Sequence, residues 1–230
     1  MVDIVCMGEM LIDMFPAEIG RPLAAVSAFY PVPGGAPANV AVAAARLGAQ
    51  SAFIGKVGAD AFGRFLAETL VRQGVQTQGM RFDAEARTGL NFHAQVDGDT
   101  ATHLFYRGAD IRLRPDELDH ALLQETRAFN FGTLGLMLQP ARSATLEALN
   151  IARAAGALIA FDVNYRPSLW TDPAQARQLI EATLPFVDVL KINADELLLI
   201  TGSTELAEGA AYLLATGVQL CVITLGPRGS

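Results

Sequence analysis

The chain has 230 residues, of which 51% are hydrophobic and 18% are charged, and its formal net charge is −7. This length and apolar content are enough for one α/β domain with a sizeable core. The negative charge disfavours a protein that binds nucleic acid or an acidic membrane, so phosphate recognition would need local amides and a few placed cations. Cys6 and Cys221 lie in apolar runs and indicate reduced thiols. Without a signal-peptide pattern or a membrane-length apolar run, we expect a cytoplasmic protein.

Short runs rich in Val, Ile and Phe alternate with longer stretches of helical period. This pattern is typical of a mostly parallel sheet flanked by helices on both faces. The predicted strands of that sheet are 3–7, 51–54, 128–131, 157–161, 187–192 and 220–225. Helices are predicted to start at Asp60, Pro140, Asn193 and Thr204, and glycines follow each of them.

The segment 88–106 breaks this alternation. Residues 88–96 and 100–106 mix polar and apolar side chains around Asp97-Gly98, which predicts an antiparallel hairpin with a tight turn. Such a hairpin suits the buried centre of a parallel sheet poorly, so we place it outside as a flap, together with 23–29. An ordinary edge hairpin is the alternative. His93 and His103 are expected on its exposed side, away from any zinc site.

The segment Gly34-Gly35-Ala36-Pro37-Ala38-Asn39 leads directly into a small-residue helical stretch. Two glycines let the backbone approach a ligand closely, and Pro37 suits the first turn of a helix whose free amides face that ligand. Asp13 follows the first predicted strand, so it can lie at the sheet edge where open α/β sheets bind ligands. Together these residues predict a cradle for a polar small molecule. Alternatively, Asp13 only caps a loop and the glycines only turn the chain.

With Arg46-Leu47-Gly48 and Gly55-Lys56-Val57-Gly58, the glycine segment resembles the first signature of the ribokinase-like (PfkB) sugar kinases. The stretch from Met7 to Asp13, the stretch from Gly79 to Asp83, and Arg87-Thr88 are similar to the fructokinase branch. The resemblance covers essentially the whole chain. It implies one ribokinase-like α/β domain over 1–230, lacking its C-terminal part, with a β lid built from about 14–33 and 86–110.

The resemblance also implies a reaction. The γ-phosphoryl group of ATP would pass to a primary hydroxyl of a small sugar, with fructose as the leading candidate, and the lid would exclude water from the reactive phosphate. ATP and Mg²⁺ would be required, a monovalent cation could contribute, and a homodimer would form through the flap. Two alternatives stay open: a catalytically silent sugar-binding or regulatory protein, and a related kinase for ribose, ketodeoxygluconate or a nucleoside.

The sugar-binding residues implied by the resemblance are Asp13, Gly34, Gly35, Asn39, Tyr106, Arg107, Asn164 and Arg166. Tyr106 and Arg107 would approach the sugar from the flap, although Arg107 would also fit a surface ion pair. Arg166 would reach the phosphates, because Pro167 favours an extended backbone before it. In the other interpretation, Asp162 and Arg166 pair with each other and close the loop.

The nucleotide-binding residues implied by the resemblance are Lys191, Asn193, Glu196, Thr224, Gly226 and Arg228. Asn193 and Glu196 have the N-x-x-E spacing that the family uses for its magnesium and phosphate network, with Glu196 acting on the metal through water. The same spacing also makes a helix capping box, and both roles can coexist. For the segment 224–229, a plain strand-to-turn exit is the alternative.

One feature of the family does not occur in these 230 residues. Related enzymes carry a Gly-Ala-Gly-Asp segment whose Asp takes the proton from the attacking hydroxyl, and this sequence contains no such segment. We therefore assign the catalytic base to none of these residues and expect it after Ser230, while Arg166 supports catalysis.

Overall fold

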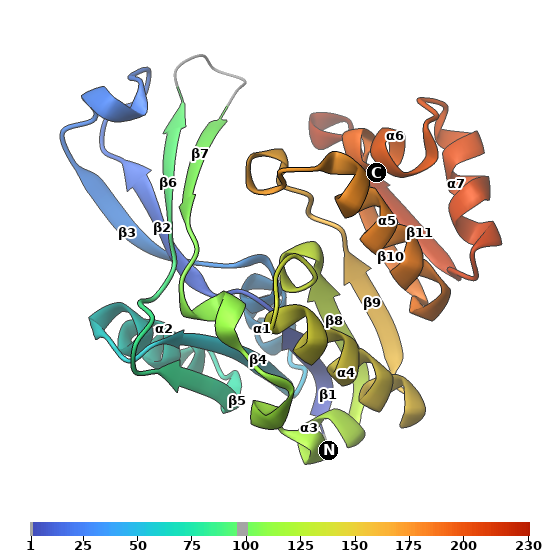
Figure 1. Cartoon of the computed structure of the whole chain (residues 1–230), viewed down its shortest axis with the longest axis horizontal. Coiled ribbons are helices and arrows are strands. Elements are labelled where there is room, and N and C mark those ends of the chain that lie inside the picture. Colours follow the sequence, from blue (N-terminus) through green and yellow to red (C-terminus); the bar gives the residue numbers. More distant parts are fainter. Residues whose placement is uncertain (1, 96–100) are drawn as a thin grey trace.

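The computed structural model describes residues 2–95 and 101–230. Their strands form two sheets, and all strand pairs of the larger sheet are parallel (Figure 1). The strands of the large sheet are β1 (Val2–Met7), β4 (Ser51–Gly58), β5 (Gln76–Asp83), β8 (Thr126–Gly132), β9 (Leu158–Asp162), β10 (Val189–Asn193) and β11 (Leu220–Thr224). Their order across the sheet is β11-β10-β9-β8-β1-β4-β5. The predicted α/β fold with a mostly parallel sheet is confirmed.

Helices lie on both faces of this sheet. They are α1 (Ala36–Arg46), α2 (Ala61–Arg72), α3 (His120–Gln124), α4 (Ala141–Ala154), α5 (Pro173–Thr183), α6 (Ala194–Thr201) and α7 (Leu206–Ala215). The predicted starts at Asp60, Pro140 and Asn193 are confirmed, whereas α7 is capped by Glu205 and not by Thr204. Over the described ranges, no helix is both long enough and apolar enough to cross a membrane.

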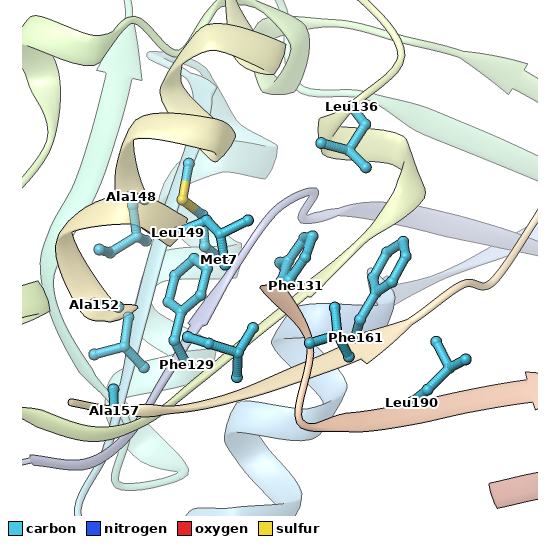
Figure 2. Close-up of a cluster of buried hydrophobic side chains, with 14 of the residues drawn as sticks. Met7, Phe129, Phe131, Leu136, Ala148, Leu149, Ala152, Ala157, Phe161 and Leu190 are labelled. Atoms are coloured by element: carbon cyan, nitrogen blue, oxygen red, sulfur yellow. The ribbon is translucent and has the colours of Figure 1, made fainter. Parts of the chain in front are cut away.

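Two hydrophobic clusters fix the helices to the sheet, one on each face. The smaller cluster packs α1 and α2 against Cys6 and Phe53 on one face of the sheet. The larger cluster packs α4, α5, α6 and α7 against the opposite face. Figure 2 shows the centre of the larger cluster, where Phe131 and Phe161 stack with ring centroids 4.6 Å apart. Fully burying one such side chain stabilises the fold by about 1.5–3 kcal/mol. Packing on both faces therefore holds the carboxyl ends of the strands in a fixed row.

The second sheet is smaller and stands apart from the large one (Figure 1). Its strands are β2 (Leu11–Pro16), β3 (Phe29–Gly34), β6 (Leu90–Gln95) and β7 (Ala101–Tyr106), in the order β3-β2-β6-β7. The predicted antiparallel hairpin is confirmed in β6 and β7, and its predicted turn at Asp97-Gly98 lies outside the described residues. All four strands lie in or next to the two segments predicted for the lid. Their action as a lid remains a prediction.

The sequence pattern gave no bounds for three strands, although the resemblance implied a β lid over about 14–33. β3 contains Pro31 and Pro33, which suggest a turn, but an edge strand tolerates residues that donate no backbone hydrogen bond. β5 is also an edge strand, and its mixed polarity hides it. The segment 23–29, predicted to accompany the flap, lies with the second sheet: its short 3-10 turn at Leu23–Ala25 contacts β6, and Phe29 begins β3. β2 and the rest of β3 complete the flap.

Candidate active site

A cavity of about 180 Å³ lies where the second sheet meets the carboxyl ends of β1, β8 and β9. Its walls come from six separate stretches of the chain. They are formed by Glu9, Leu11, Asp13, Gly35, Ala36, Asn39, Asn91, His93, His103, Phe105, Leu134, Asn164 and Arg166. Five of the predicted sugar-binding residues are among them: Asp13, Gly35, Asn39, Asn164 and Arg166. The cavity has a size and a polar lining that suit a small hydroxylated molecule.

Asp13 lies inside β2, in the second sheet, and not in a loop after the first strand. One of its carboxylate oxygens, Oδ1, accepts hydrogen bonds from Asn91 Nδ2 at 2.8 Å and His93 Nε2 at 2.7 Å. The other oxygen, Oδ2, lies against Gly34, where a Cβ atom would come within 1.9 Å of it. Gly34 therefore does not line the cavity but leaves room for the carboxylate that does.

The start of α1 forms the opposite wall of the cavity. Gly35 is its N-cap, with a φ of 114° that favours glycine, and a Cβ there would lie 2.4 Å from the carbonyl oxygen of Glu9. The backbone N–H of Ala36 donates to Glu9 Oε1 at 2.9 Å. Asn39 follows on the first turn and lines the cavity. The predicted turn of the chain is present, and it brings the helix start to the cavity.

Glu9 is a cavity residue that was not predicted. It is only 4% exposed, and burial raises the pKa of its carboxyl to about 7. Within the described part of the chain, its second oxygen, Oε2, is buried and has no hydrogen-bond partner. The signal in the sequence is a lone acidic residue between Met7 and Met10 in an apolar run, directly after a buried strand. Glu9 therefore lines the cavity with one oxygen bound to the start of α1 and the other buried without a partner.

The structure corrects the prediction for the end of the hairpin. Side chains alternate along β7, so His103 and Phe105 line the cavity while Tyr106 lies exposed on the other face. Arg107 turns away and forms a buried ion pair, in which its Nε donates to Asp110 Oδ2 at 2.6 Å. The alternative of an ion pair for Arg107 is therefore present, although it is buried and not on the surface. Phe105 is the aromatic residue that the flap places in the cavity.

The expectation that His93 and His103 lie on the exposed side of the hairpin is wrong. Both face the cavity, and the His103 ring lies edge-on to that of His93, with centroids 4.7 Å apart. Burial, followed by the positive charge that His93 and Arg166 can carry, lowers the pKa of His103. In the described residues, no three His, Cys, Asp or Glu side chains are grouped so that they could bind a metal.

Asn164 and Arg166 enter the cavity from the loop after β9. Asn164 has a φ of 41°, a left-handed conformation that Asn adopts more readily than most residues. The alternative pairing of Asp162 with Arg166 is wrong, because Asp162 Oδ1 lies 3.1 Å from Lys191 Nζ. Arg166 therefore presents its charge to the cavity.

The predicted nucleotide-binding residues form a second group, at the carboxyl ends of β9, β10 and β11. Neighbouring strands align Lys191 with Asp162 and Asn193 with Thr224. The Thr224 hydroxyl donates to the carbonyl oxygen of Ile192 at 3.2 Å. Gly226, with a φ of 62°, and exposed Arg228 follow in a short 3-10 turn. None of these residues lines the sugar-sized cavity, so the two groups form adjacent regions.

Glu196 joins the two regions. Its Oε2 accepts the backbone N–H of Asn193 at 2.7 Å and completes the predicted capping box of α6, in which Asn193 Oδ1 accepts the N–H of Glu196 at 2.8 Å. Its Oε1 accepts the N–H of Tyr165 at 2.6 Å, between the two loop residues that enter the cavity. The side chain is buried, and burial raises its pKa. Glu196 therefore ties the cavity loop to the start of α6.

The comparisons with known proteins agree with this geometry. Residues 1–230 match the profile described as pfkB family carbohydrate kinase. The chain is 42% identical to Fructokinase-2 of Solanum lycopersicum over 230 residues, which cover 98% of this chain and 70% of that protein.

Solved structures give the same result. The structure of Halothermothrix orenii fructokinase matches with a TM-score of 0.89 and 32% identity, over 98% of this chain and 80% of that one. The structure of fructokinase with bound ATP from Xylella fastidiosa matches with a TM-score of 0.85 and 33% identity, over 97% and 68% of the two chains.

Proposed function

Because the chain belongs to the pfkB family of carbohydrate kinases, we propose that it transfers the γ-phosphoryl group of ATP to a primary hydroxyl of fructose. The observation that carries the choice of a sugar is the cavity, where Asp13, Asn39 and Asn164 converge from three distant parts of the chain. Carboxylate and amide groups are suited to the hydroxyls of a neutral sugar. The ribokinase-like fold and the similarity to fructokinases support fructose as that sugar.

In this proposal the chain's residues act mainly by alignment, because phosphoryl transfer leaves a protein little covalent chemistry to perform. Asp13, Gly35 and Asn39 hold the sugar, and Arg166 faces the transferred phosphoryl group between the two regions. The loop and helix start joined by Glu196 keep these groups in register. The catalytic base is assigned to none of the 230 residues, because they contain no Gly-Ala-Gly-Asp segment.

Lys191, Asn193, Thr224, Gly226 and Arg228 lie at or after the carboxyl ends of β10 and β11, and we call them the strand-end row. We also propose that ATP lies along this row and that Mg²⁺ accompanies its phosphates. Mg²⁺ would neutralise phosphate charge there. Both oxygens of Glu196 already accept backbone amides, which supports contact with the ion through water over direct coordination. A monovalent cation as an additional activator remains part of the proposal.

A homodimer formed through the second sheet is a further part of the proposal. Phe15, Tyr30 and Val32 share one face of this sheet and are exposed, although all three are apolar or aromatic. Exposed apolar patches of this kind mark interaction surfaces. A cytoplasmic setting is proposed as well, supported by the free thiols of Cys6 and Cys221. Light scattering on the wild-type protein and a Tyr30→Asp variant tests the dimer, which the charge should dissociate.

The test of the reaction is a substrate panel with the full-length protein, ATP and Mg²⁺. Formation of ADP is followed with fructose, ribose, ketodeoxygluconate and a nucleoside as acceptors. We expect the highest kcat/KM with fructose. A higher value with another acceptor would replace fructose as the substrate, and ADP formation with none of them would overturn the kinase proposal.

A further inference from the structure

The carboxylate of Asp13 is held by two side chains of one strand. Asn91 and His93 lie two residues apart on β6, so both point to the same face of the second sheet. Asn91 is aligned with Asp13 on the neighbouring strand β2, and both donors converge on Oδ1, at 2.8 and 2.7 Å. Oδ1 is therefore fully engaged by the protein, which leaves Oδ2 to contact a ligand.

The contact with His93 depends on which ring nitrogen carries the proton. A carboxylate oxygen only accepts hydrogen bonds, so the 2.7 Å contact between His93 Nε2 and Asp13 Oδ1 is a hydrogen bond when Nε2 carries the hydrogen. Asn91 Nδ2 also lies 2.8 Å from Nε2, and in the other tautomer Nε2 would accept from that amide instead. Which ring nitrogen carries the proton sets the direction in which the ring can donate.

Packing fixes the plane of the His93 ring. Phe15 stacks on it with centroids 4.3 Å apart and an angle of 13° between the planes. His103 meets it edge-on from β7, with centroids 4.7 Å apart. The side chain is only 15% exposed, so water competes little for its hydrogen bond. The donor is thus aimed at Asp13 before any ligand arrives.

We propose that His93 is a positioning residue for sugar binding: its Nε2–H orients the Asp13 carboxylate so that Oδ2 is presented to a sugar hydroxyl. This inference rests on the proposed function, because it takes a sugar as the ligand of the cavity. It assigns a binding role to the second sheet beyond covering the site, because His93 on β6 orients the carboxylate of Asp13 on β2. His93 itself does not take part in phosphoryl transfer.

Two substitutions separate the donor from the ring. His93→Phe keeps an aromatic ring against Phe15 and removes the donor, whereas His93→Gln places an amide N–H near the position of Nε2 and removes the ring. We expect His93→Phe to raise the KM for fructose, and its Kd by calorimetry, about tenfold, with the KM for ATP and kcat changed less than twofold. His93→Gln should stay within about threefold of the wild type.

The control is His120→Gln, a change at an exposed histidine far from the cavity in the sequence, which should alter neither KM. Unchanged fructose affinity in a folded His93→Phe protein would overturn the inference. An equal loss of fructose affinity in both His93 variants would also overturn the inference, because the effect would then come from the ring and not from the hydrogen-bond donor. If His93→Phe does not fold, His93→Val serves as the variant without a donor.

A spectroscopic test needs no substrate. In ¹H–¹⁵N spectra of the histidine rings, the signals that disappear in His93→Gln should show a proton on Nε2, and Asp13→Asn should shift them. A proton on Nδ1 alone would refute the inference. A wild-type protein that phosphorylates no sugar but shows the Nε2 proton would refute the proposed function and leave the positioning contact in place.

Discussion

The cavity and the strand-end row satisfy their polar groups in different ways. In the cavity, Asp13 bonds to Asn91 and His93, residues 78 and 80 positions away in the sequence. In the row, Asn193 and Glu196 bond to each other across one helical turn. The cavity therefore exists only in the folded chain, whereas the capping box of the row forms within the first turn of α6. In the proposed function, specificity for the sugar depends on the region that needs both sheets.

The two buried glutamates show the same difference. Glu196 has a backbone N–H on each carboxylate oxygen, so its burial is compensated. Glu9 has one, from Ala36, and its other oxygen has no partner among the described residues. Burial raises the pKa of both. A buried oxygen without a partner is a cost to folding, and groups with perturbed pKa values of this kind gather at functional sites.

The largest effect is expected for Asp13→Asn. The amide cannot accept hydrogen bonds from Asn91 and His93 and at the same time bind sugar hydroxyls as a carboxylate does. Hydrogen bonds to charged groups contribute about 1.5–3 kcal/mol each, so their loss is costly. The KM for fructose should rise about 1,000-fold with the fold intact, as measured by steady-state kinetics and circular dichroism. Asp116→Asn, at an exposed surface ion pair, is the matched control and should change nothing. A fructose KM within twofold of the wild type would remove Asp13 from the sugar site.

Glu9 should make stability depend on pH. Its folded pKa of about 7 lies above the ordinary value of 4.5, so the unfolded chain releases the proton first as the pH rises. Stability from this group is fully present below pH 4.5 and is lost up to about pH 7. The loss should be about 3 kcal/mol. Urea unfolding of the wild type and Glu9→Gln across this range measures it, and parallel curves for the two proteins would contradict the shift.

Glu196→Ala should weaken both regions at once. The change leaves the buried N–H groups of Asn193 and Tyr165 without their acceptor, which costs about 2 kcal/mol in the free energy of unfolding. The KM values for fructose and for ATP should both rise, because the cavity loop and the α6 start lose their common partner. Glu125→Ala, outside both regions, is the control. An increase in the ATP KM alone would show that the link to the loop is unimportant.

The sequence predicts best what depends on neighbours along the chain. Strands of the parallel sheet appear as continuous apolar runs, so β1, β8, β10 and the edge strand β11 were predicted close to their true bounds. Caps such as Asp60 and Asn193 follow from local spacing. Five predicted sugar residues do line one cavity.

The errors concern which face of a strand meets the site. In β7 a shift of one residue exchanges Tyr106 for Phe105, and the hairpin pattern does not reveal the side on which the cavity lies. The same ambiguity placed His93 and His103 on the wrong side. Asp13 was predicted at the edge of the large sheet, because β3 with its prolines, and thus the second sheet, did not appear in the pattern.

The smallest effect is expected at Gly34, and it tests whether the cavity, unlike the strand-end row, depends on exact packing around Asp13. A Cβ at this position would lie 1.9 Å from Asp13 Oδ2, so Gly34→Ala must displace the carboxylate, although the flexible side chain can move. The fructose KM should rise roughly tenfold while the ATP KM stays unchanged. Gly89→Ala is the matched control, because its Cβ would meet its nearest neighbours at an ordinary 3.4 Å. If the two substitutions have equal effects, Asp13 Oδ2 has freedom to move. The hydrogen bonds from β6 alone would then not hold the carboxylate in place.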